Sequence, residues 1–268
     1  MRSVLDQGYP DLEYLVMDGG STDGSADLIG RYADRLTAWR SGPDGGPYSA
    51  VNTGFRETTG EVMGWLNADD LYLPWTFSVV AEIFRTHPQV RWITAAHQLL
   101  CDSQGRAVAS ARSWGYSRKA FLGGDNLPRP GRLASGWIQQ EATFWRRSLW
   151  EEAGGLDPAY PLAGDFALWC RFYQHAELWS VMTPLAAFRQ HGDQRSVHHR
   201  QAYLEEAEKA LRDHGGARWG AVRAGIEVGL KRSAPRAVRA VAQRFGLGGP
   251  CGALRYDVEA GRWHAERV

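Results

Sequence analysis

Two neighbouring aspartates, Asp69 and Asp70, are the first candidates for chemistry in this sequence. The apolar residues 62–66 before them predict a buried strand, and Pro74 after them predicts the first turn of a helix. Carboxylates at the carboxyl end of such a strand lie in the crevice where open α/β sheets bind ligands. Their oxygens suit Mg²⁺ or Mn²⁺, which in turn bind phosphate oxygens. A solvated turn that caps the next helix explains the same residues, because aspartate and asparagine are ordinary turn residues.

Two glycine-rich loops follow strands earlier in the chain. Residues 12–17 predict a strand, and Asp18 at its end is aimed to accept a hydrogen bond from a ligand. The serine, threonine and aspartate after it can also cap the next helix, which is the simpler explanation of that turn. The loop 41–47 is too rich in glycine and proline for a helix or strand, and residues 48–58 predict a helix.

Strands and helices alternate along the N-terminal half of the sequence. The predicted order up to residue 95 is strand, helix, strand, loop, helix, strand, helix, strand. This alternation predicts an α/β fold with a parallel, doubly wound sheet and helices on both faces. Beyond it, residues 97–112 predict a hairpin and residues 138–147 a strand. The irregular segment 112–133 is long enough to cover an active site.

The composition excludes two classes of protein and bounds the number of domains. The chain has 268 residues with 31 basic and 30 acidic side chains, so it lacks the cationic excess of a nucleic-acid binder. No apolar run reaches the roughly 18 residues that a membrane helix needs, and no signal-peptide core follows Met1. The length predicts one large domain plus an appendage. Three cysteines without metal-type spacing predict reduced, buried thiols of a cytoplasmic protein, namely Cys101, Cys170 and Cys251.

Three motifs resemble, in order and spacing, the nucleotide-sugar domain of the family 2 glycosyltransferases. They are Asp-Gly-Gly-Ser-Thr-Asp-Gly-Ser from residue 18, Pro-Asp-Gly-Gly-Pro-Tyr from residue 43, and Thr-Gly-Glu-Val-Met-Gly-Trp-Leu-Asn-Ala-Asp-Asp from residue 59. The resemblance implies a GT-A-like, open and mostly parallel α/β sheet with helices on both faces. It also implies a nucleotide-sugar donor whose two phosphates are bridged by a divalent cation, Mn²⁺ or Mg²⁺.

The acidic cluster takes the place of the family's DXD-type motif. The amide of Asn67 replaces the first acid, so Asp69 becomes the expected metal ligand with Asp70 beside it. The resemblance further implies that Asp18 faces the nucleotide base and that the loop and helix after residue 43 line the nucleotide pocket. The residues expected to bind the nucleotide and its cation are therefore Asp18, Asp44, Asn52, Asn67, Asp69 and Asp70.

Two later segments resemble the acceptor side of the same enzymes. Asp165, within Gly-Asp-Phe-Ala-Leu-Trp-Cys-Arg from residue 164, matches the catalytic base, although an aspartate at a helix start is by default an N-cap. His191 ends a Phe-Arg-Gln-His segment whose histidine, in the family, completes the metal shell or contacts the diphosphate. A lone histidine after a strand is more often structural. The resemblance thus implies Asp165 as base and Asp69, Asp70 and His191 as metal residues.

The family's first strand has no counterpart in the sequence. Family members begin with a strand that carries a threonine or serine near its end, and residues 2–8 match only the tail of the helix after it. We expect either a start codon placed too late or a fragment. Restoring the upstream residues is then expected to raise donor affinity.

The composition changes near residue 198. We expect a catalytic domain over 1–197 and a helical extension over 198–268. Its basic helix, expected within 221–245, can lie on an anionic membrane face, which suits a cytoplasmic enzyme with a lipid-linked acceptor. A solvated helix packed on the domain is the competing interpretation. The basic residues concerned are Lys231, Arg232, Arg236, Arg239 and Arg244.

The expected function is an inverting glycosyltransferase of polysaccharide, cell-wall or glycoconjugate biosynthesis. It would move a hexose from a nucleotide-diphosphate sugar, of the UDP type, to a saccharide or lipid-linked acceptor. Asp165 would take the proton of the acceptor hydroxyl while the cation neutralises charge on the leaving diphosphate. Two alternatives stay open: a metal-dependent nucleotidyltransferase, and a catalytically impaired carbohydrate-binding or scaffold protein.

Overall fold

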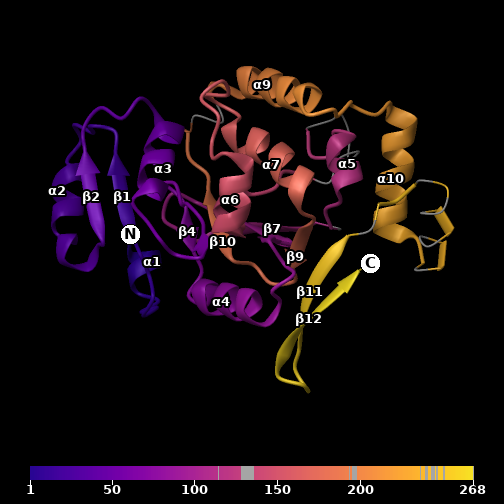
Figure 1. The fold of residues 1–268 in the computed structure, drawn as a ribbon, viewed down its shortest axis with the longest axis horizontal. Coiled ribbons are helices and arrows are strands. Elements are labelled where there is room, and N and C mark those ends of the chain that lie inside the picture. The colour runs from indigo at the N-terminus through magenta and orange to yellow at the C-terminus, as the bar shows by residue number, and fades with distance from the viewer. Residues whose placement is uncertain are drawn as a thin grey trace.

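The computed structural model describes residues 1–113, 115–127, 136–192, 194, 198–235, 237–238, 241–242, 245, 247–249 and 251–267. Within these residues the strands form three sheets. Helices α6, α7 and α9 cover one side of the molecule, and α4 covers the opposite side (Figure 1). The α/β class predicted from the alternating pattern is therefore confirmed.

The smallest sheet lies in the N-terminal part. β1 (Leu15–Asp18) pairs in parallel with β2 (Ala38–Ser41), with Asp18 opposite Ser41. A crossover between the two strands is formed by α2 (Ser25–Gly30) and the 3₁₀ turn η1 (Ala33–Arg35). The short helix α1 (Arg2–Leu5) precedes β1, and α3 (Pro47–Arg56) follows β2 with its proline in the first turn. The loops after β1 and β2 therefore open at the same end of this sheet.

The largest sheet has six strands in the order β12-β11-β9-β5-β8-β3. β5 pairs in parallel with β9, and β9 in parallel with β11, whereas β8 runs antiparallel to both β5 and β3. The expectation of a mostly parallel sheet is therefore wrong, because β8 lies between β3 and β5 and runs antiparallel to both. The strands are β3 (Val62–Met63), β5 (Trp92–Ala95), β8 (Thr143–Arg146), β9 (Leu178–Val181), β11 (Gly252–Asp257) and β12 (Arg262–Arg267).

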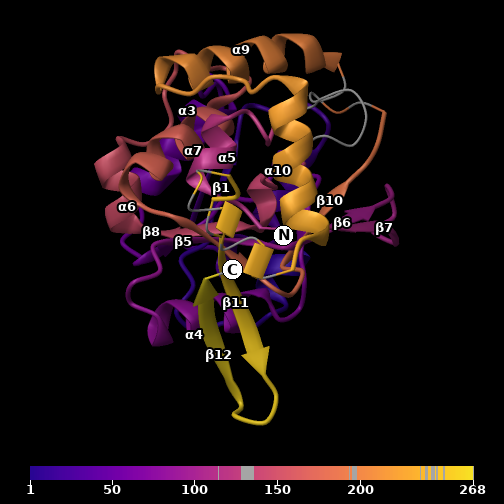
Figure 2. The same cartoon turned by 90° about the vertical axis from the view of Figure 1, so that its right-hand side faces the viewer.

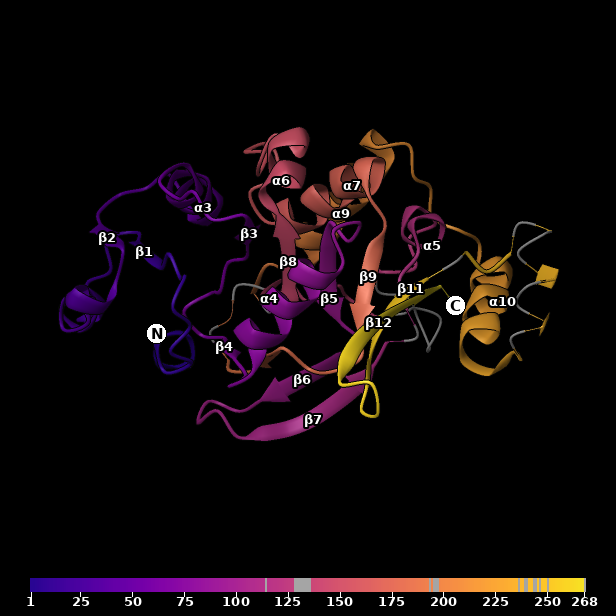
Figure 3. The ribbon, with the colours of Figure 1, turned by 60° about the horizontal axis from the view of Figure 1, so that its bottom comes forward.

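A third sheet of four strands connects the acidic turn to the segment before His191. Its order is β4-β10-β6-β7, with β10 antiparallel to β4 and parallel to β6. β6 and β7 form the predicted hairpin, which Figure 3 shows along the lower edge of the molecule. The strands are β4 (Leu71–Tyr72), β6 (His97–Cys101), β7 (Ala107–Arg112) and β10 (Ala186–Arg189).

Two apolar cores lie on opposite faces of the largest sheet. α4 (Thr76–Thr86) contributes Val80, Ile83 and Phe84 to one core. α6 (Arg147–Ala153) and α7 (Gly164–His175) pack in the other, where several tryptophans contact one another. The rings of Trp145 and Trp169 lie 5.8 Å apart edge to face, and both are fully buried. The tryptophan content thus serves packing here, and the three cysteines are buried and free as predicted.

The segment after residue 198 is only partly helical. α9 (Arg200–Asp213) packs on α7, and α10 (Ala221–Ser233) follows it. β11 then pairs with β9, and the β11–β12 hairpin projects from the molecule (Figure 2). α9 and α10 fit the expected helical extension, whereas residues 252–267 form a hairpin that extends the main sheet. The division at residue 198 itself stays a prediction.

Three local predictions differ from the structure. The strand expected over 62–66 keeps only two paired residues, and the following helix begins at Thr76, after Pro74. The strand expected from 138 starts with the 3₁₀ turn η2 (Gln140–Ala142), and the loop region contains α5 (Arg118–Leu122). None of the helices in the described part of the chain has the length and apolar character that a bilayer crossing requires.

Candidate active site

Asp18, at the end of β1, is surrounded by hydrogen-bond donors. Its Oδ2 accepts from the backbone N–H of Ser21 at 3.1 Å and from the Ser41 hydroxyl at 2.6 Å. Its Oδ1 accepts from the Ser21 hydroxyl at 2.5 Å. The two hydroxyls lower the pKa of Asp18, because they stabilise its ionised form. The side chain is therefore held as a carboxylate, partly open to solvent.

Asp44 lies against the same turn. Its Oδ1 accepts from the Gly46 N–H at 2.8 Å, which folds the loop before α3 back on itself. A Cβ atom added at Gly19 would lie only 3.1 Å from Asp44 Oδ2, so the absence of a side chain lets the two loops approach. The structure thus brings together the loops of Asp18 and Asp44, both predicted on the nucleotide side.

Asn52 has a different role from the one expected. Its Nδ2 donates to the Leu156 carbonyl at 2.8 Å, and its Oδ1 accepts from the Leu156 N–H at 2.9 Å. Both ends of the amide are therefore used to join α3 to the loop before α7. We do not place Asn52 among the nucleotide-binding residues, because its hydrogen-bonding groups are already engaged.

Asp69 and His191 meet across 122 positions of sequence. Asp69 Oδ2 lies 3.1 Å from His191 Nε2, and the two side chains are 36% and 30% exposed. Arg189 fixes the turn that carries Asp69: its Nε donates to the Asp69 carbonyl at 2.5 Å, and its Nη1 donates to the Ser103 carbonyl at 2.6 Å. The antiparallel pairing of β4 with β10 holds these segments side by side.

The Asp69–His191 pair fits a cation that arrives with a phosphorylated ligand. One carboxylate and one imidazole are acceptable ligands for Mn²⁺ or Mg²⁺, but an octahedral shell needs about six donors. In the described ranges, no group of three or more His, Cys, Asp or Glu side chains is arranged to hold a metal ion. Phosphate oxygens and water would therefore have to complete the shell.

Asp70 is buried, unlike the side chains of Asp69 and His191. Its side chain is 6% exposed, and its Oδ1 accepts from the Arg189 N–H at 3.0 Å. Its Oδ2 has no hydrogen-bond partner among the described residues. Burial raises the pKa of Asp70 to about 6, although the Arg189 bond opposes this shift. The bonded oxygen of Asp70 thus anchors β10, and a place for Asp70 in the metal shell stays a prediction.

Asn67 contacts η2 through its side chain. Its Nδ2 donates to Gln140 Oε1 at 3.3 Å, and Gln140 Nε2 donates to the Trp65 carbonyl at 2.6 Å. These bonds connect the acidic turn to the segment before β8. Asn67 thus helps to hold the turn in place through its amide nitrogen.

Glu141 is a buried carboxyl that the sequence analysis missed. It is 3% exposed, and its Oε1 has no hydrogen-bond partner in the part of the chain that the structure describes. Burial, followed by the charge of Asp70, raises the pKa of Glu141 to about 8, and the charges of Asp165 and Asp69 add to the shift. Glu141 is therefore mostly protonated at neutral pH. Asp69 and Asp165 therefore both lie within electrostatic reach of Glu141.

Asp165 lies in the first turn of α7, as predicted. Its Oδ1 and Oδ2 accept from the hydroxyl of Tyr203 on α9, at 3.2 and 3.4 Å. Burial raises the pKa of Asp165 to about 6, and hydrogen bonds from the Phe166 N–H and the Tyr203 hydroxyl oppose the shift. The group is thus an ionised acid at neutral pH that accepts a proton more readily than an ordinary aspartate.

Tyr203 and Glu206 are further residues that sequence reasoning missed. Glu206 Oε2 accepts from the N–H groups of Leu162 and Ala163 at 2.8 and 2.9 Å, just before α7. α9 therefore holds both the base and the loop in front of it. The spacing of the two residues marks one helical face, but nothing in the sequence indicates which neighbour that face contacts. The side chains of the basic residues expected on the last helix lie outside the described residues.

The donor-side motifs are also recognised by family comparison. Residues 1–122 match the family described as Glycosyl transferase family 2. The match covers the three donor-side motifs and a little under half of the chain. The resemblance inferred from the three motifs is therefore confirmed.

Curated relatives of the chain are named as uncharacterized glycosyltransferases. An uncharacterized glycosyltransferase of Nostoc sp. is 26% identical over 227 residues, which are 78% of this chain and 65% of the relative. An uncharacterized glycosyltransferase of Mycobacterium tuberculosis is 26% identical over 173 residues, which are 62% of this chain and 59% of the relative. The chain thus spans less than two thirds of the length of either relative.

A solved structure shares the fold of this chain. The crystal structure of residues 1–349 of S. aureus TarS, in complex with UDP-GlcNAc, matches with a TM-score of 0.58 and 15% identity. The match covers 89% of this chain and 70% of that chain. The expected GT-A-like fold is therefore confirmed, with the mixed strand directions described above.

Proposed function

We propose that this chain is an inverting, cation-dependent glycosyltransferase that uses a nucleotide-diphosphate sugar. The observation that carries the proposal is the position of Glu141, on which the charges of both Asp69 and Asp165 act. A group suited to a cation and a group suited to proton removal thus both lie within electrostatic reach of one buried carboxyl. Sugar transfer from a diphosphate needs both at one reacting centre.

The base in this proposal is Asp165. Its carboxylate takes the proton of an acceptor hydroxyl while the hydroxyl oxygen attacks the anomeric carbon, and the bond from that carbon to the diphosphate oxygen breaks on the opposite face. The Tyr203 hydroxyl holds the carboxylate in position. A pKa of about 6 favours this role, because a general base works best near the pH of operation.

Donor binding is assigned to two pairs of residues. Asp18 and Asp44 bind the nucleotide, and Asp69 and His191 bind the cation. Asp18 accepts hydrogen bonds from the nucleotide base, and Asp44 lines the pocket beside it. Asp69 and His191 hold Mn²⁺ or Mg²⁺, which neutralises the negative charge of the leaving diphosphate. The protonated Glu141 donates a hydrogen bond to the ligand, which its unpartnered oxygen supports.

A UDP-type hexose donor and a saccharide or lipid-linked acceptor complete the proposal. TarS, which has the same fold, was crystallised with UDP-GlcNAc, and this supports a UDP sugar at the level of fold. Such an acceptor places the proposed enzyme in the biosynthesis of a polysaccharide or glycoconjugate. Its proposed location is the cytoplasm, where nucleotide sugars are made.

Release of free nucleotide from a panel of UDP, GDP and dTDP sugars tests the proposal. We expect release of one nucleotide in the presence of Mn²⁺ or Mg²⁺, and loss of the reaction in EDTA. Equal release with and without cation would contradict the metal assignment. Donor binding without any hydrolysis or transfer would instead favour the impaired binding or scaffold protein, and release of sugar 1-phosphate would favour a nucleotidyltransferase.

A further inference from the structure

α10 packs on the rest of the molecule through its N-terminal end and one face. The N–H of Trp219, just before the helix, donates to the Gly123 carbonyl at 2.9 Å, at the C-terminal end of α5. A Cβ atom added at Gly123 would lie only 2.1 Å from the Trp219 ring, so the two residues are in close contact. Ala224, Glu227 and Val228 form the buried face of α10. Figure 1 shows α10 at one edge of the molecule, and Figure 2 looks onto that edge.

The outer face of α10 is apolar although it faces solvent. Val222 is 80% exposed, and Ile226, one turn later on the same face, is 46% exposed. A helix that is merely solvated would carry polar side chains at these positions. Three more exposed apolar residues follow at the spacing i, i+3 and i+7, namely Val238, Val241 and Phe245. Single exposed apolar residues are ordinary, but five within this short segment indicate a binding surface.

The same segment is strongly cationic. Residues 221–245 contain six basic residues and one acidic residue, Glu227. Glu227 is fully buried, and its Oε2 accepts from the Gly248 N–H at 2.8 Å, so its charge does not face solvent. Because the whole chain has 31 basic and 30 acidic residues, the rest of it keeps 25 basic and 29 acidic ones. The positive charge is therefore concentrated in this segment, and the remainder is acidic.

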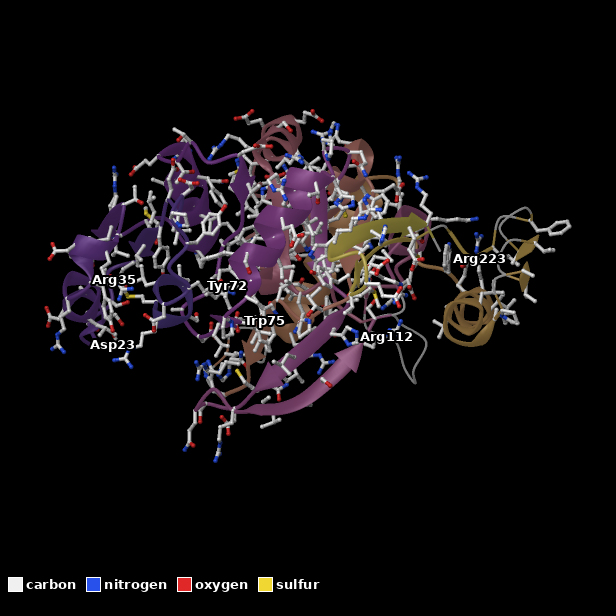
Figure 4. The ribbon with its side chains drawn as sticks, turned by 90° about the horizontal axis from the view of Figure 1, so that it is seen from below. Asp23, Arg35, Tyr72, Trp75, Arg112 and Arg223 are labelled. Carbon is white, nitrogen blue, oxygen red and sulfur yellow. The ribbon has the colours of Figure 1, made fainter. Side chains whose placement is uncertain are left out.

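Arg223 places one of these charges beside the apolar face. It follows Val222 directly and is exposed, and its Cζ lies 4.6 Å from the centroid of the Trp219 ring. Figure 4 shows Arg223 on α10, at the opposite end of the molecule from Asp23 and Arg35. The cationic segment is therefore remote from the donor-side loop after β1, and a partner bound to it leaves that loop open.

We propose that the exposed face of α10, together with Val238, Val241 and Phe245, binds the surface of an anionic phospholipid bilayer. The apolar side chains enter the boundary between headgroups and acyl chains, and the basic residues attract lipid phosphates. A second copy of the chain fits less well, because self-contact would bring two cationic segments together. A nucleic acid would respond to the charge and leave the valine, isoleucine and phenylalanine side chains unpartnered. Binding needs neither donor nor acceptor, so the proposal is independent of the transfer reaction.

Sedimentation with lipid vesicles tests this proposal. The whole chain is mixed with vesicles of phosphatidylcholine alone, or of phosphatidylcholine with phosphatidylglycerol, at low and at high salt. We expect at least about tenfold stronger binding to the anionic vesicles at low salt, because several basic residues lie close to the lipid surface. Binding should weaken as salt screens these charges.

Two kinds of variant separate the apolar from the electrostatic contribution. The double variant Val222→Ser/Ile226→Ser should weaken binding to anionic vesicles about tenfold, because less apolar area enters the bilayer, and Phe245→Ser should do the same. Arg223→Gln removes one positive charge and should weaken binding about fivefold at low salt. The effect of the apolar substitutions should persist at high salt, whereas that of Arg223→Gln should fade.

Exposed valines elsewhere provide matched controls. Val108 on β7 is 57% exposed, and Val258 in the turn between β11 and β12 is 84% exposed. Val108→Ser and Val258→Ser make the same chemical change outside the cationic segment, so both variants should bind vesicles like the wild type. Losses in these controls equal to that of the α10 variant would mean that the assigned face has no special role.

Three further results would overturn the proposal. Absent binding, or equal binding to neutral and anionic vesicles, would exclude recognition of an anionic bilayer. Loss of binding in Arg223→Gln but not in the apolar variants would indicate a purely electrostatic contact, as with a nucleic acid. Dimers in sedimentation velocity without lipid, dissociated by Val222→Ser/Ile226→Ser, would assign the face to a second copy of the chain.

Discussion

Asp18 and Asp165 are the same residue type in opposite environments. Asp18 lies in an open loop, where two serine hydroxyls lower its pKa. Asp165 lies under α9, where burial raises its pKa to about 6. A group that only recognises a ligand works best when it is ionised at every working pH, whereas a base must be able to hold a proton briefly. The carboxyl groups of Asp18 and Asp165 therefore differ in their exposure to water and not in residue type.

The largest effect should come from Asp165→Asn. We expect the transfer rate to fall at least about 100-fold, because the amide cannot take the acceptor proton. Donor binding, measured by calorimetry with the nucleotide, should stay unchanged, so kcat falls and KM for the donor does not. Normal turnover by this variant would remove Asp165 from the role of base.

A matched control and a stability measurement support that prediction. Glu177→Gln replaces an exposed acid beyond the C-terminus of α7 and should leave the rate unchanged. The raised pKa of Asp165 means that the native state binds its proton more tightly than the unfolded chain does. Its ionisation therefore lowers stability as the pH rises from about 4 to above 6, and Asp165→Asn should be at least as stable as the wild type at pH 8 in urea unfolding.

Asp69→Asn should have the next largest effect. The variant loses the charged ligand beside His191, so we expect binding of UDP in Mn²⁺ to weaken by about 10- to 100-fold. In EDTA the variant and the wild type should bind UDP equally weakly. Wild-type binding that is the same with and without cation would contradict the assignment.

Asp18→Asn should weaken nucleotide binding to a smaller extent. A hydrogen bond to a charged group contributes about 1.5–3 kcal/mol, so we expect at least about tenfold weaker binding of the nucleotide. The loss should appear with and without cation, unlike that of Asp69→Asn. Asp23→Asn is the control, because Asp23 lies in the same loop and caps Ser25. Equal losses in both variants would mean that the loop, and not the carboxylate, was disturbed.

The pH dependence of kcat/KM distinguishes the two aspartates. As the pH falls through about 6, Asp165 gains a proton and can no longer act as base, so the rate should drop about tenfold per pH unit below that value. Asp18, whose pKa is lowered, should stay ionised there, and nucleotide binding should not follow the same curve. A rate that is flat between pH 5 and 7 would contradict the assigned base.

The smallest effect is expected for Glu141→Gln. Glu141 is mostly protonated at neutral pH, and glutamine is a neutral hydrogen-bonding group of the same shape, so the rate should change less than about threefold. Glu141→Leu removes the hydrogen-bonding group and should lower the rate much more at unchanged folding. Similar rates for the wild type, Glu141→Gln and Glu141→Leu would exclude contact between Glu141 and the ligand.

The sequence predicted those parts of the site that local motifs specify. Strand and helix alternation gave the α/β class, and the motifs pointed to Asp69, His191 and Asp165. It could not show that Asn52 is fully engaged by Leu156, or that Tyr203 reaches Asp165, because both contacts join segments distant in sequence. Glu141 was missed for a related reason: a lone glutamate gives no sign of burial.

Strand directions and the far end of the chain were less predictable. The antiparallel position of β8 depends on which edge of β5 it joins, and residue patterns do not specify this. The pairing of β11 with β9 likewise depends on contacts across about 70 positions.

Arg189 connects the β6–β7 hairpin to the turn that carries Asp69. One guanidinium group binds the carbonyls of Asp69 and of Ser103, at the tip of a hairpin whose outer strand is exposed along its whole length. If heating disorders the hairpin tip, Arg189 loses its contact with Ser103 and holds the turn of Asp69 less firmly. We therefore expect the stability of the turn that carries Asp69 to depend in part on this exposed hairpin edge.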